Sequence, residues 1–417
     1  MSDNRYFPIK IDPSCRLKWS WSTIYLNNGT TASCHRASSS KLDIDSFDNF
    51  HNTEEKIQAR ESMLKGLWPT GGCEYCRDIE SAGGQSDRQF QNQIPDVYPL
   101  VLDENPLATV VDPVILEVFF SNTCNLKCVY CNAKLSSSIQ AEDKKFGNSI
   151  IKKNNFEYID NQYQLLIPKF WNWFNKNSLT LKRLQVLGGE PFLQQDVIKL
   201  IDYFEQQAHP ELEFNLITNL SLPSKVIKQI LQRLNNLLES NKLKRVDMQV
   251  SIDTWSPAQE YIRNGLSLEQ FDKNMKDMID FGSFRIGLLS TVTSLSIPTM
   301  IDLLHKRTDW NQIQTIFWYM HLVLPHGDSI FSPTIFNYSV FEEYLNKVGD
   351  LLPNNTWDDK TTREIFFGIV STLRQHCRTN IIKQKELLEY LEENDRRRGS
   401  NWQKIFPWLV KELENVV

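Results

Sequence analysis

Short apolar segments and longer amphipathic segments alternate from residue 113 onward. Segment 114–120 is rich in β-branched and aromatic residues, which predicts a buried strand. Segment 224–239 instead repeats Val226, Ile230 and Leu234 at about 3.6 positions a turn, which predicts an amphipathic helix. The same criteria predict further strands at 182–187, 212–218, 244–252, 284–293 and 314–323, and helices at 157–176, 194–207, 267–280 and 297–308.

Strands and helices that alternate at this spacing predict right-handed βαβ units and a parallel sheet, so the expected fold class is α/β. Segment 18–26, which precedes these units, alternates in polarity, and the turn signal Asn27-Asn28-Gly29 predicts a β-hairpin with a second strand at 30–34. The expected organisation is a small domain at 1–90, a linker at 91–112, the α/β domain at 113–330 and a helical region at 331–417. Helices of the last region are expected at 339–352, 360–376, 379–394 and 401–415.

Charge and cysteine usage narrow the class of protein. The chain has 417 residues, with 46 basic and 51 acidic side chains and a net charge of −5, which argues against a nucleic-acid partner. It has no signal-like start and no apolar run of the roughly 18 residues that a membrane helix needs. We therefore expect a cytoplasmic protein, in which eight cysteines point to metal binding or catalysis before disulfides.

Three cysteines form a C-x3-C-x2-C motif directly after the strand at 114–120. Cys124, Cys128 and Cys131 are one thiolate short of the four that usually hold a cubane cluster, so one iron would stay open for a substrate or cofactor. A loop at the carboxyl end of a strand is where α/β proteins keep their chemistry. A zinc knuckle completed by a distant fourth ligand is the alternative.

This motif, with the aromatic Tyr130 before the last cysteine and the preceding strand, resembles that of the radical S-adenosylmethionine (radical SAM) enzymes. The resemblance implies a partial (β/α)6 barrel and a [4Fe-4S] cluster on the three cysteines. It also implies that the open iron binds the amino and carboxylate groups of S-adenosylmethionine (SAM). Cleavage of SAM would give a 5′-deoxyadenosyl radical that takes hydrogen from a C–H bond, and the protein would hold and orient the reactants.

Further motifs stand at the ends of later strands. Gly188, Gly189 and Glu190 resemble the GGE motif that binds the amino group of SAM, although a tight turn capped by a proline would explain them too. Ser251 and Asp253 resemble the family's ribose contacts. Arg263 resembles its carboxylate contact; an Asp helix cap with a surface arginine is the alternative.

Asn219 ends the third predicted strand and receives a minor role in shaping the wall of the site. The family often has Thr-Asn-Gly at this point, and Leu220 departs from that pattern.

The first four cysteines form a separate pattern, C-x13-G-x4-C followed by C-x2-C, at Cys15, Cys34, Cys73 and Cys76. It resembles the shortened, single-cluster form of the SPASM domain, called a twitch domain. The resemblance implies an auxiliary iron–sulfur cluster, expected to be [4Fe-4S], although such modules normally follow the barrel and this one precedes it. A structural zinc site is the alternative, and spacing does not separate the two.

The resemblance implies hydrogen abstraction from a substrate carbon, with a peptide or protein as the expected substrate and an external electron donor such as flavodoxin or ferredoxin. The alternatives are a dehydrogenase or mutase acting on a small molecule, and a zinc-stabilised binding protein without activity.

His321, His326 and Asp328 lie at or after the end of the last predicted barrel strand and are candidates for substrate contact or proton transfer. The basic run 396–398 is expected to be a solvated helix end.

Overall fold

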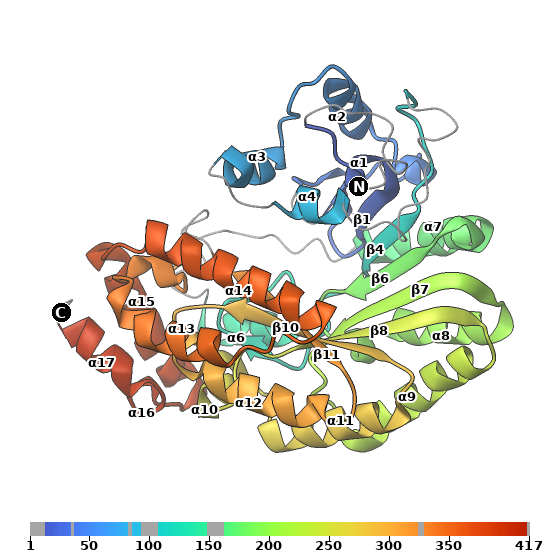
Figure 1. Cartoon of the computed structure of the whole chain (residues 1–417). Helices are drawn as coiled ribbons and strands as arrows, with labels where there is room; N and C mark the ends of the chain where they lie inside the picture. Colours follow the sequence, from blue (N-terminus) through green and yellow to red (C-terminus); the bar gives the residue numbers. More distant parts are fainter. Residues whose placement is uncertain are drawn as a thin grey trace. The chain divides into compact units, whose positions relative to one another are not determined.

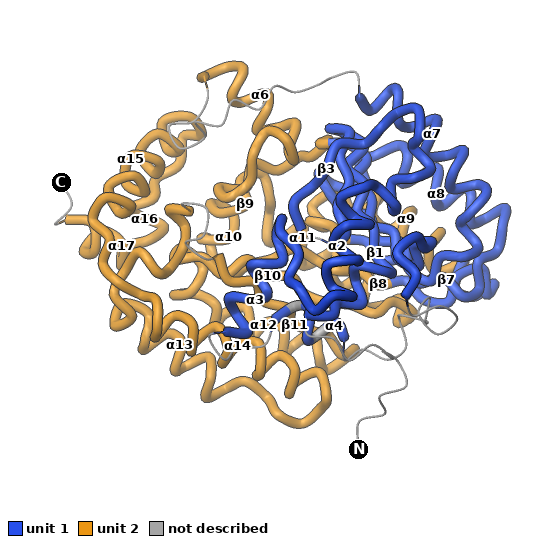
Figure 2. The backbone as a smooth tube through the Cα atoms, turned by 90° about the horizontal axis from the view of Figure 1, so that it is seen from above, with its two compact units in different colours: residues 1–121, 158–216, 237–246 blue, residues 122–157, 217–236, 247–417 orange. Residues whose placement is uncertain are grey.

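The computed structural model describes residues 13–34, 37–81, 86–92, 107–147, 162–323 and 329–414 (Figure 1). The chain divides into two compact units, which are coloured separately in Figure 2. Unit 1 comprises 1–121, 158–216 and 237–246, and unit 2 comprises 122–157, 217–236 and 247–417. Each unit contains parallel strands and helices, so the α/β class is confirmed.

The sheet of unit 1 is built around β4 (Ile115–Phe119), which is parallel to β1 (Trp21–Tyr25) on one side and to β6 (Arg183–Leu187) on the other. Strand β6 is also parallel to β7 (His209–Thr218). The side chains of β4 explain its central position, since Ile115, Leu116 and Val118 have no exposed surface. Two short strands, β2 (Thr30–Ala32) and β3 (Ser40–Lys41), extend the sheet in antiparallel fashion beyond β1.

The predicted hairpin is therefore present as β1 and β2, and it belongs to the same sheet as the first barrel strand. Residues 18–20, which the alternating pattern assigned to a strand, belong to the short helix α1 (Leu17–Ser20) instead. The period-2 pattern was misleading here because all four residues of α1 are buried. The remaining helices of unit 1 are α2 (Glu54–Leu64), α3 (Cys73–Ser81), α4 (Asp87–Asn92), α7 (Gln162–Asn177) and α8 (Gln195–Gln206).

In unit 2, strand β10 (Arg285–Val292) lies parallel between β8 (Leu243–Ser251) and β11 (Ile316–Leu322). The first residues of β8 belong to unit 1 and the rest to unit 2. A separate antiparallel bridge joins β5 (Lys127–Cys128) to β9 (Arg263–Asn264). The helices of this part are α6 (Ser137–Phe146), α9 (Ser224–Glu239), which continues into unit 1, α10 (Pro257–Ile262), α11 (Leu268–Phe281) and α12 (Met300–Asn311).

The predicted helical region 331–417 contains α13 (Ser339–Leu351), α14 (Trp357–His376) and α15 (Ile381–Arg398), followed by two shorter helices. These are α16 (Trp402–Ile405) and α17 (Pro407–Leu413), which replace the single helix expected at 401–415. The interruption is at Pro407, which stands at the first position of α17, where a missing N–H costs nothing. Among the described residues, no helix is long and apolar enough to cross a membrane.

Every predicted strand and helix of the α/β region has a counterpart within a few residues. The segment 132–156 contains α6, and its residues after 147 lie outside the described part of the chain. The predicted linker lies largely outside it as well. The domain boundaries given above stay predictions.

Candidate functional site

The loop that bears Cys124, Cys128 and Cys131 is fastened to the first turn of α6. The Ser137 hydroxyl accepts from the Cys124 amide at 3.1 Å, and the Ser138 hydroxyl donates to the Cys124 carbonyl at 2.7 Å. Ser136, the N-cap of α6, donates to Leu126 at 2.7 Å. The three serines thus hold the backbone of the loop in place. The three thiols of the loop are half-buried.

The middle of the loop is held by the β5–β9 bridge, which no sequence pattern predicted. Cys128 pairs with Arg263, and the amide of Val129 donates to the carbonyl of Ile262 at 2.8 Å. Gly265 allows this approach, since a Cβ there would lie 3.1 Å from the Asn125 carbonyl oxygen and its φ is +103°. A two-residue bridge is too short to give a hydrophobic period, so it leaves no signal in the sequence.

Arg263 and Asp253 form a bidentate ion pair beside the cysteine loop. Arg263 donates to the two carboxylate oxygens at 2.9 and 3.0 Å, and the Tyr130 hydroxyl donates to the same carboxylate at 2.7 Å. The amide of Thr291 adds a fourth hydrogen bond at 2.8 Å. The predicted residues Tyr130, Asp253 and Arg263 are therefore together, but the carboxylate is already occupied by partners within the protein.

The same guanidinium affects the thiol of Cys128. Desolvation raises the pKa of this thiol, whereas the neighbouring positive charge and hydrogen bond of Arg263 lower it. Arg263 thus faces a predicted cluster ligand on one side and Asp253 on the other. Ser251, which stands at the end of β8, is half-buried and lies two residues before this ion pair.

Helix α15 holds the cysteine loop from a distant part of the sequence. Arg398 donates to the carbonyl of Lys127 at 2.9 Å and makes two hydrogen bonds with Glu142 of α6, at 3.1 and 2.9 Å. The Tyr390 hydroxyl donates to the Val129 carbonyl at 3.1 Å. The expectation that the basic run is a solvated helix end is therefore wrong for Arg398, whose side chain is 4% exposed.

The end of β7 contributes an amide to the loop. Asn219 donates to the side-chain oxygen of Asn125 at 2.9 Å, and its nitrogen is 4.0 Å from the sulfur of Cys124. The next residue, Leu220, has a φ of +51°, in the left-handed region that favours glycine. This conformation explains why a glycine is natural at this position, and Leu220 adopts it with a fully buried side chain.

The Gly188-Gly189-Glu190 turn belongs to unit 1, where it follows β6. Gly188 has a φ of +87°, and a Cβ there would lie 2.3 Å from the ring of Phe119 at the end of β4. Gln194 accepts from the Ser121 amide at 3.1 Å and donates to the Gly188 carbonyl. The buried carboxylate of Glu190 accepts from the Phe192 amide at 3.2 Å, so part of its hydrogen-bonding capacity serves its own turn.

The structure does not test the three residues that were predicted to contact substrate or transfer protons. His321 lies on β11 and is exposed, paired in register with Thr291 of β10. His326 and Asp328 lie outside the described residues. All three stay predictions.

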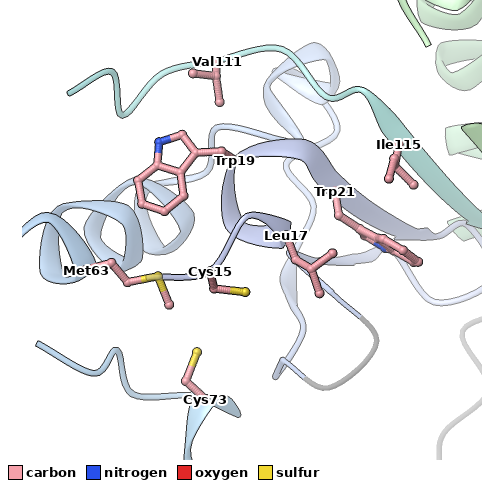
Figure 3. Packing of buried hydrophobic residues seen from close by; sticks show 8 residues of the cluster. All are labelled: Cys15, Leu17, Trp19, Trp21, Met63, Cys73, Val111 and Ile115. Carbon is pink, nitrogen blue, oxygen red and sulfur yellow. The ribbon is translucent and has the colours of Figure 1, made fainter. Parts of the chain in front are cut away.

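In unit 1, the four N-terminal cysteines line one cavity, although they are far apart in the sequence. Cys15 precedes α1, Cys34 follows β2, and Cys73 and Cys76 face the cavity from the first turn of α3. Figure 3 shows the side chain of Cys73 pointing toward Cys15, with Met63 beside them. Burial raises the pKa of the Cys15 thiol to about 12, so a metal would have to displace its proton.

The two glycines before Cys73 hydrogen-bond to a side chain of the helix that follows them. The amides of Gly71 and Gly72 donate to the carboxylate of Glu74 at 3.1 and 2.6 Å, so they cap the start of α3. This places Cys73 and Cys76 three residues apart on one face of a helix. Arg88 of α4, which also lines the cavity, is 8% exposed and pairs with Glu80.

The arrangement in unit 2 can now be compared with known proteins. The profile of the radical SAM superfamily matches residues 118–304, a range that includes the three cysteines, the Gly-Gly-Glu turn and the Asp253–Arg263 pair. Residues 118–304 are thus a radical SAM superfamily domain. The superfamily implies an enzyme with a [4Fe-4S] cluster that binds SAM and uses a substrate and an electron donor.

Among curated proteins, the chain is 24% identical over 208 residues to a probable GTP 3′,8-cyclase of Methanocaldococcus jannaschii. The match covers 50% of this chain and 59% of that relative. Among solved structures, TYW1 with a lysine-pyruvate adduct bound matches 59% of the chain and 75% of its own length, at 16% identity and a TM-score of 0.28. The FeFe-hydrogenase maturase HydG from Carboxydothermus hydrogenoformans matches 89% and 94%, at 12% identity and a TM-score of 0.30.

The donor sets suit iron–sulfur clusters. Both are composed of cysteine thiols, which such clusters require, and the first set has three thiols where a cluster with one open iron needs three. Among the residues that the structure describes, no three His, Cys, Asp or Glu side chains are arranged around a single metal ion.

Proposed function

We propose that this protein cleaves SAM reductively at Cys124, Cys128 and Cys131 and abstracts hydrogen from a carbon of its substrate. The observation that carries the proposal is the anchored cysteine loop inside the segment that matches the superfamily. A cluster held by these three cysteines would supply the electron that cleaves SAM. The chain's own task is to hold the loop in place, through α6, β9 and α15, and to exclude water from it.

The remaining predicted residues would bind SAM through charge or through hydrogen bonds. Glu190 would accept hydrogen bonds from its ammonium group, and Ser251 would bond to a ribose hydroxyl. Arg263 has a positive charge suited to the carboxylate of SAM, but its two strongest hydrogen bonds go to Asp253. We therefore assign Asp253 the role of orienting Arg263 and Tyr130, in place of the ribose contact that the resemblance implied.

We further propose that Cys15, Cys34, Cys73 and Cys76 hold an auxiliary [4Fe-4S] cluster. Their convergence on one cavity from three separate elements supports this proposal. Four cysteines leave no iron open, so this cluster would exchange electrons and would not bind substrate directly. Structural zinc is the competing occupant.

A peptide or protein is the substrate class that we favour, because an auxiliary cluster suits an oxidative modification such as a crosslink, a double bond or an epimer. The similarity to a probable GTP 3′,8-cyclase favours a small molecule instead. Flavodoxin or ferredoxin would donate the first electron in either case.

Anaerobic purification tests the two clusters together. About eight irons per chain are expected from two cubanes, and a variant with Cys124, Cys128 and Cys131 all changed to alanine should retain about four. SAM should change the electron paramagnetic resonance (EPR) spectrum of the reduced wild-type protein and not that of the variant. Colourless protein that contains zinc and forms no 5′-deoxyadenosine with SAM and dithionite would falsify the proposal.

Substrate class is tested by deuterium transfer. Candidate peptides and candidate nucleotides, each deuterated at carbon, are incubated with SAM and dithionite, and 5′-deoxyadenosine is analysed by mass spectrometry. Deuterium from a peptide supports the favoured class, and deuterium from a nucleotide alone supports the small-molecule alternative.

A further inference from the structure

Basic side chains are buried at and near the N-terminal cysteine cavity. Lys18 and Arg88 line the cavity, and Arg88 pairs with Glu80. Lys18 is 4% exposed, and Lys56 and Arg60 of α2, which do not line the cavity, are 4% and 0% exposed. Lys18, Lys56 and Arg60 all lie in unit 1, which also contains the four cysteines.

The hydrogen-bond partners of Lys18, Lys56 and Arg60 are neutral. The ammonium of Lys18 donates to the Ser33 hydroxyl at 2.9 Å and lies within hydrogen-bonding reach of the sulfur of Cys73. In the described part of the chain, none of the three forms an ion pair with a carboxylate. The partners of Lys56 are Ser22, Thr31 and the carbonyl of Phe50, and those of Arg60 are Asn52, His51 and the carbonyls of Lys18, His51 and Thr109.

A buried charge without a partner of opposite sign is costly, and proteins retain one where a bound group supplies the opposite charge. Four thiolates around an iron–sulfur core carry a net negative charge, and reduction adds one more negative charge. Lys18, which lines the cavity, therefore matches the cysteine site in sign and favours its reduced state over its oxidised state.

Building on the auxiliary cluster proposed above, we propose that Lys18 is a positioning residue that raises the reduction potential of this cluster. The ammonium of Lys18 would stabilise the negative charge that reduction adds, and Ser33, which accepts its hydrogen bond, would hold it in place.

The test uses the full chain with Cys124, Cys128 and Cys131 changed to alanine, so that only the N-terminal site contributes a signal. Redox titration followed by EPR should give a more negative midpoint potential after Lys18→Met. The expected change is about tenfold in the reduction equilibrium, which is ~59 mV for one electron. Lys18→Gln, which keeps a donor for Ser33 without the charge, should shift in the same direction, and Lys18→Arg should remain near the parent.

Lys65→Met is the matched control, since Lys65 is exposed at the end of α2 and its charge is screened by water. It should leave the potential unchanged. An iron-loaded Lys18→Gln or Lys18→Met protein with the parent's potential overturns the role of Lys18 and leaves the cluster intact. A parent that contains zinc or no metal overturns both the cluster and the role of Lys18, whereas SAM cleavage by the wild-type protein would still support the main activity.

Discussion

Arg263 holds Asp253 through two parallel hydrogen bonds of 2.9 and 3.0 Å, and both side chains are shielded from water. This pair lies next to Cys128, whose backbone is bridged to Arg263. The carboxylate thus fixes the guanidinium against a predicted cluster ligand, and Tyr130 is fixed by the same group. The residues after β8 therefore contribute to the shape of the cysteine loop as well as to any ligand.

Asp253→Asn should destabilise the protein, because it leaves Arg263 buried without its counter-charge. Removal of one partner of a buried pair costs about 3–5 kcal/mol. Urea unfolding of the anaerobic protein measures the loss. Ser251→Ala serves as the comparison and should raise the KM for SAM with little change in stability; a similar stability for both variants contradicts the orienting role of Asp253.

Cys128→Ala should abolish 5′-deoxyadenosine formation, because two thiolates do not retain the cluster. Cys377→Ala is the matched control, since Cys377 is a buried thiol that contacts the Pro333 carbonyl and belongs to neither cysteine set. Chromatography of the reaction mixture with SAM and dithionite measures the product. Persistent product in Cys128→Ala would remove the loop from the mechanism.

Cys73→Ala should separate the two cysteine sites. SAM cleavage should survive, because the three-cysteine loop is intact, whereas formation of the final product should fall. The ratio of 5′-deoxyadenosine to product, measured in one reaction, checks this. An unchanged ratio means that the N-terminal site is structural.

Gly188→Ala should be more harmful than Gly282→Ala. Both glycines have positive φ, +87° and +69°, so both substitutions pay the left-handed penalty of about 1–2 kcal/mol. Only at Gly188 does the new Cβ meet the ring of Phe119, at 2.3 Å, which adds about 1–3 kcal/mol of overpacking. Thermal unfolding compares the two, and equal losses would contradict the packing explanation.

Glu142 should make the protein sensitive to acid. Burial acts to raise the pKa of this carboxyl, but hydrogen bonds from Arg398 and Lys127 outweigh it and hold the pKa at about 2. Because the folded value is below the ordinary 4.5, the stabilisation is complete above about pH 4.5 and is lost as the pH falls towards 2. It is on the order of 3 kcal/mol.

Urea unfolding at pH 6 and pH 3 measures this effect. Glu142→Gln should be less stable than wild type at pH 6, and the difference should shrink at pH 3. Glu343→Gln is the control, because Glu343 pairs with Lys347 on an exposed surface and should change little at either pH. A constant difference between Glu142→Gln and wild type at both pH values would contradict the linkage.

The sequence predicted the repeating elements well, because each strand and helix of the α/β region buries an apolar face that sets a period. The hydrophobic period was misleading in α1, where every side chain is buried. Burial on all sides does not distinguish a strand from a helix. It was silent on the β5–β9 bridge, which is a contact between segments more than 130 residues apart and only two residues long.

Charge was harder to predict than hydrophobicity. Arginine and lysine side chains are usually exposed to water, and the sequence around Arg398 and Lys18 does not indicate that they are buried. Their partners, Glu142 and Ser33, come from other elements that only the fold brings close. The cysteine motifs could be recognised because their spacing is local, whereas the residues that hold them in place are distant in sequence.

Tyr390 anchors a carbonyl of the cysteine loop that lies 261 positions earlier in the chain. On the ribosome, the loop therefore emerges long before the helix that ties it down. Iron–sulfur assembly factors that act during translation would meet an untethered loop. Once α15 has been synthesised and folded, the loop is held in its final conformation. Cluster insertion is therefore expected to be post-translational.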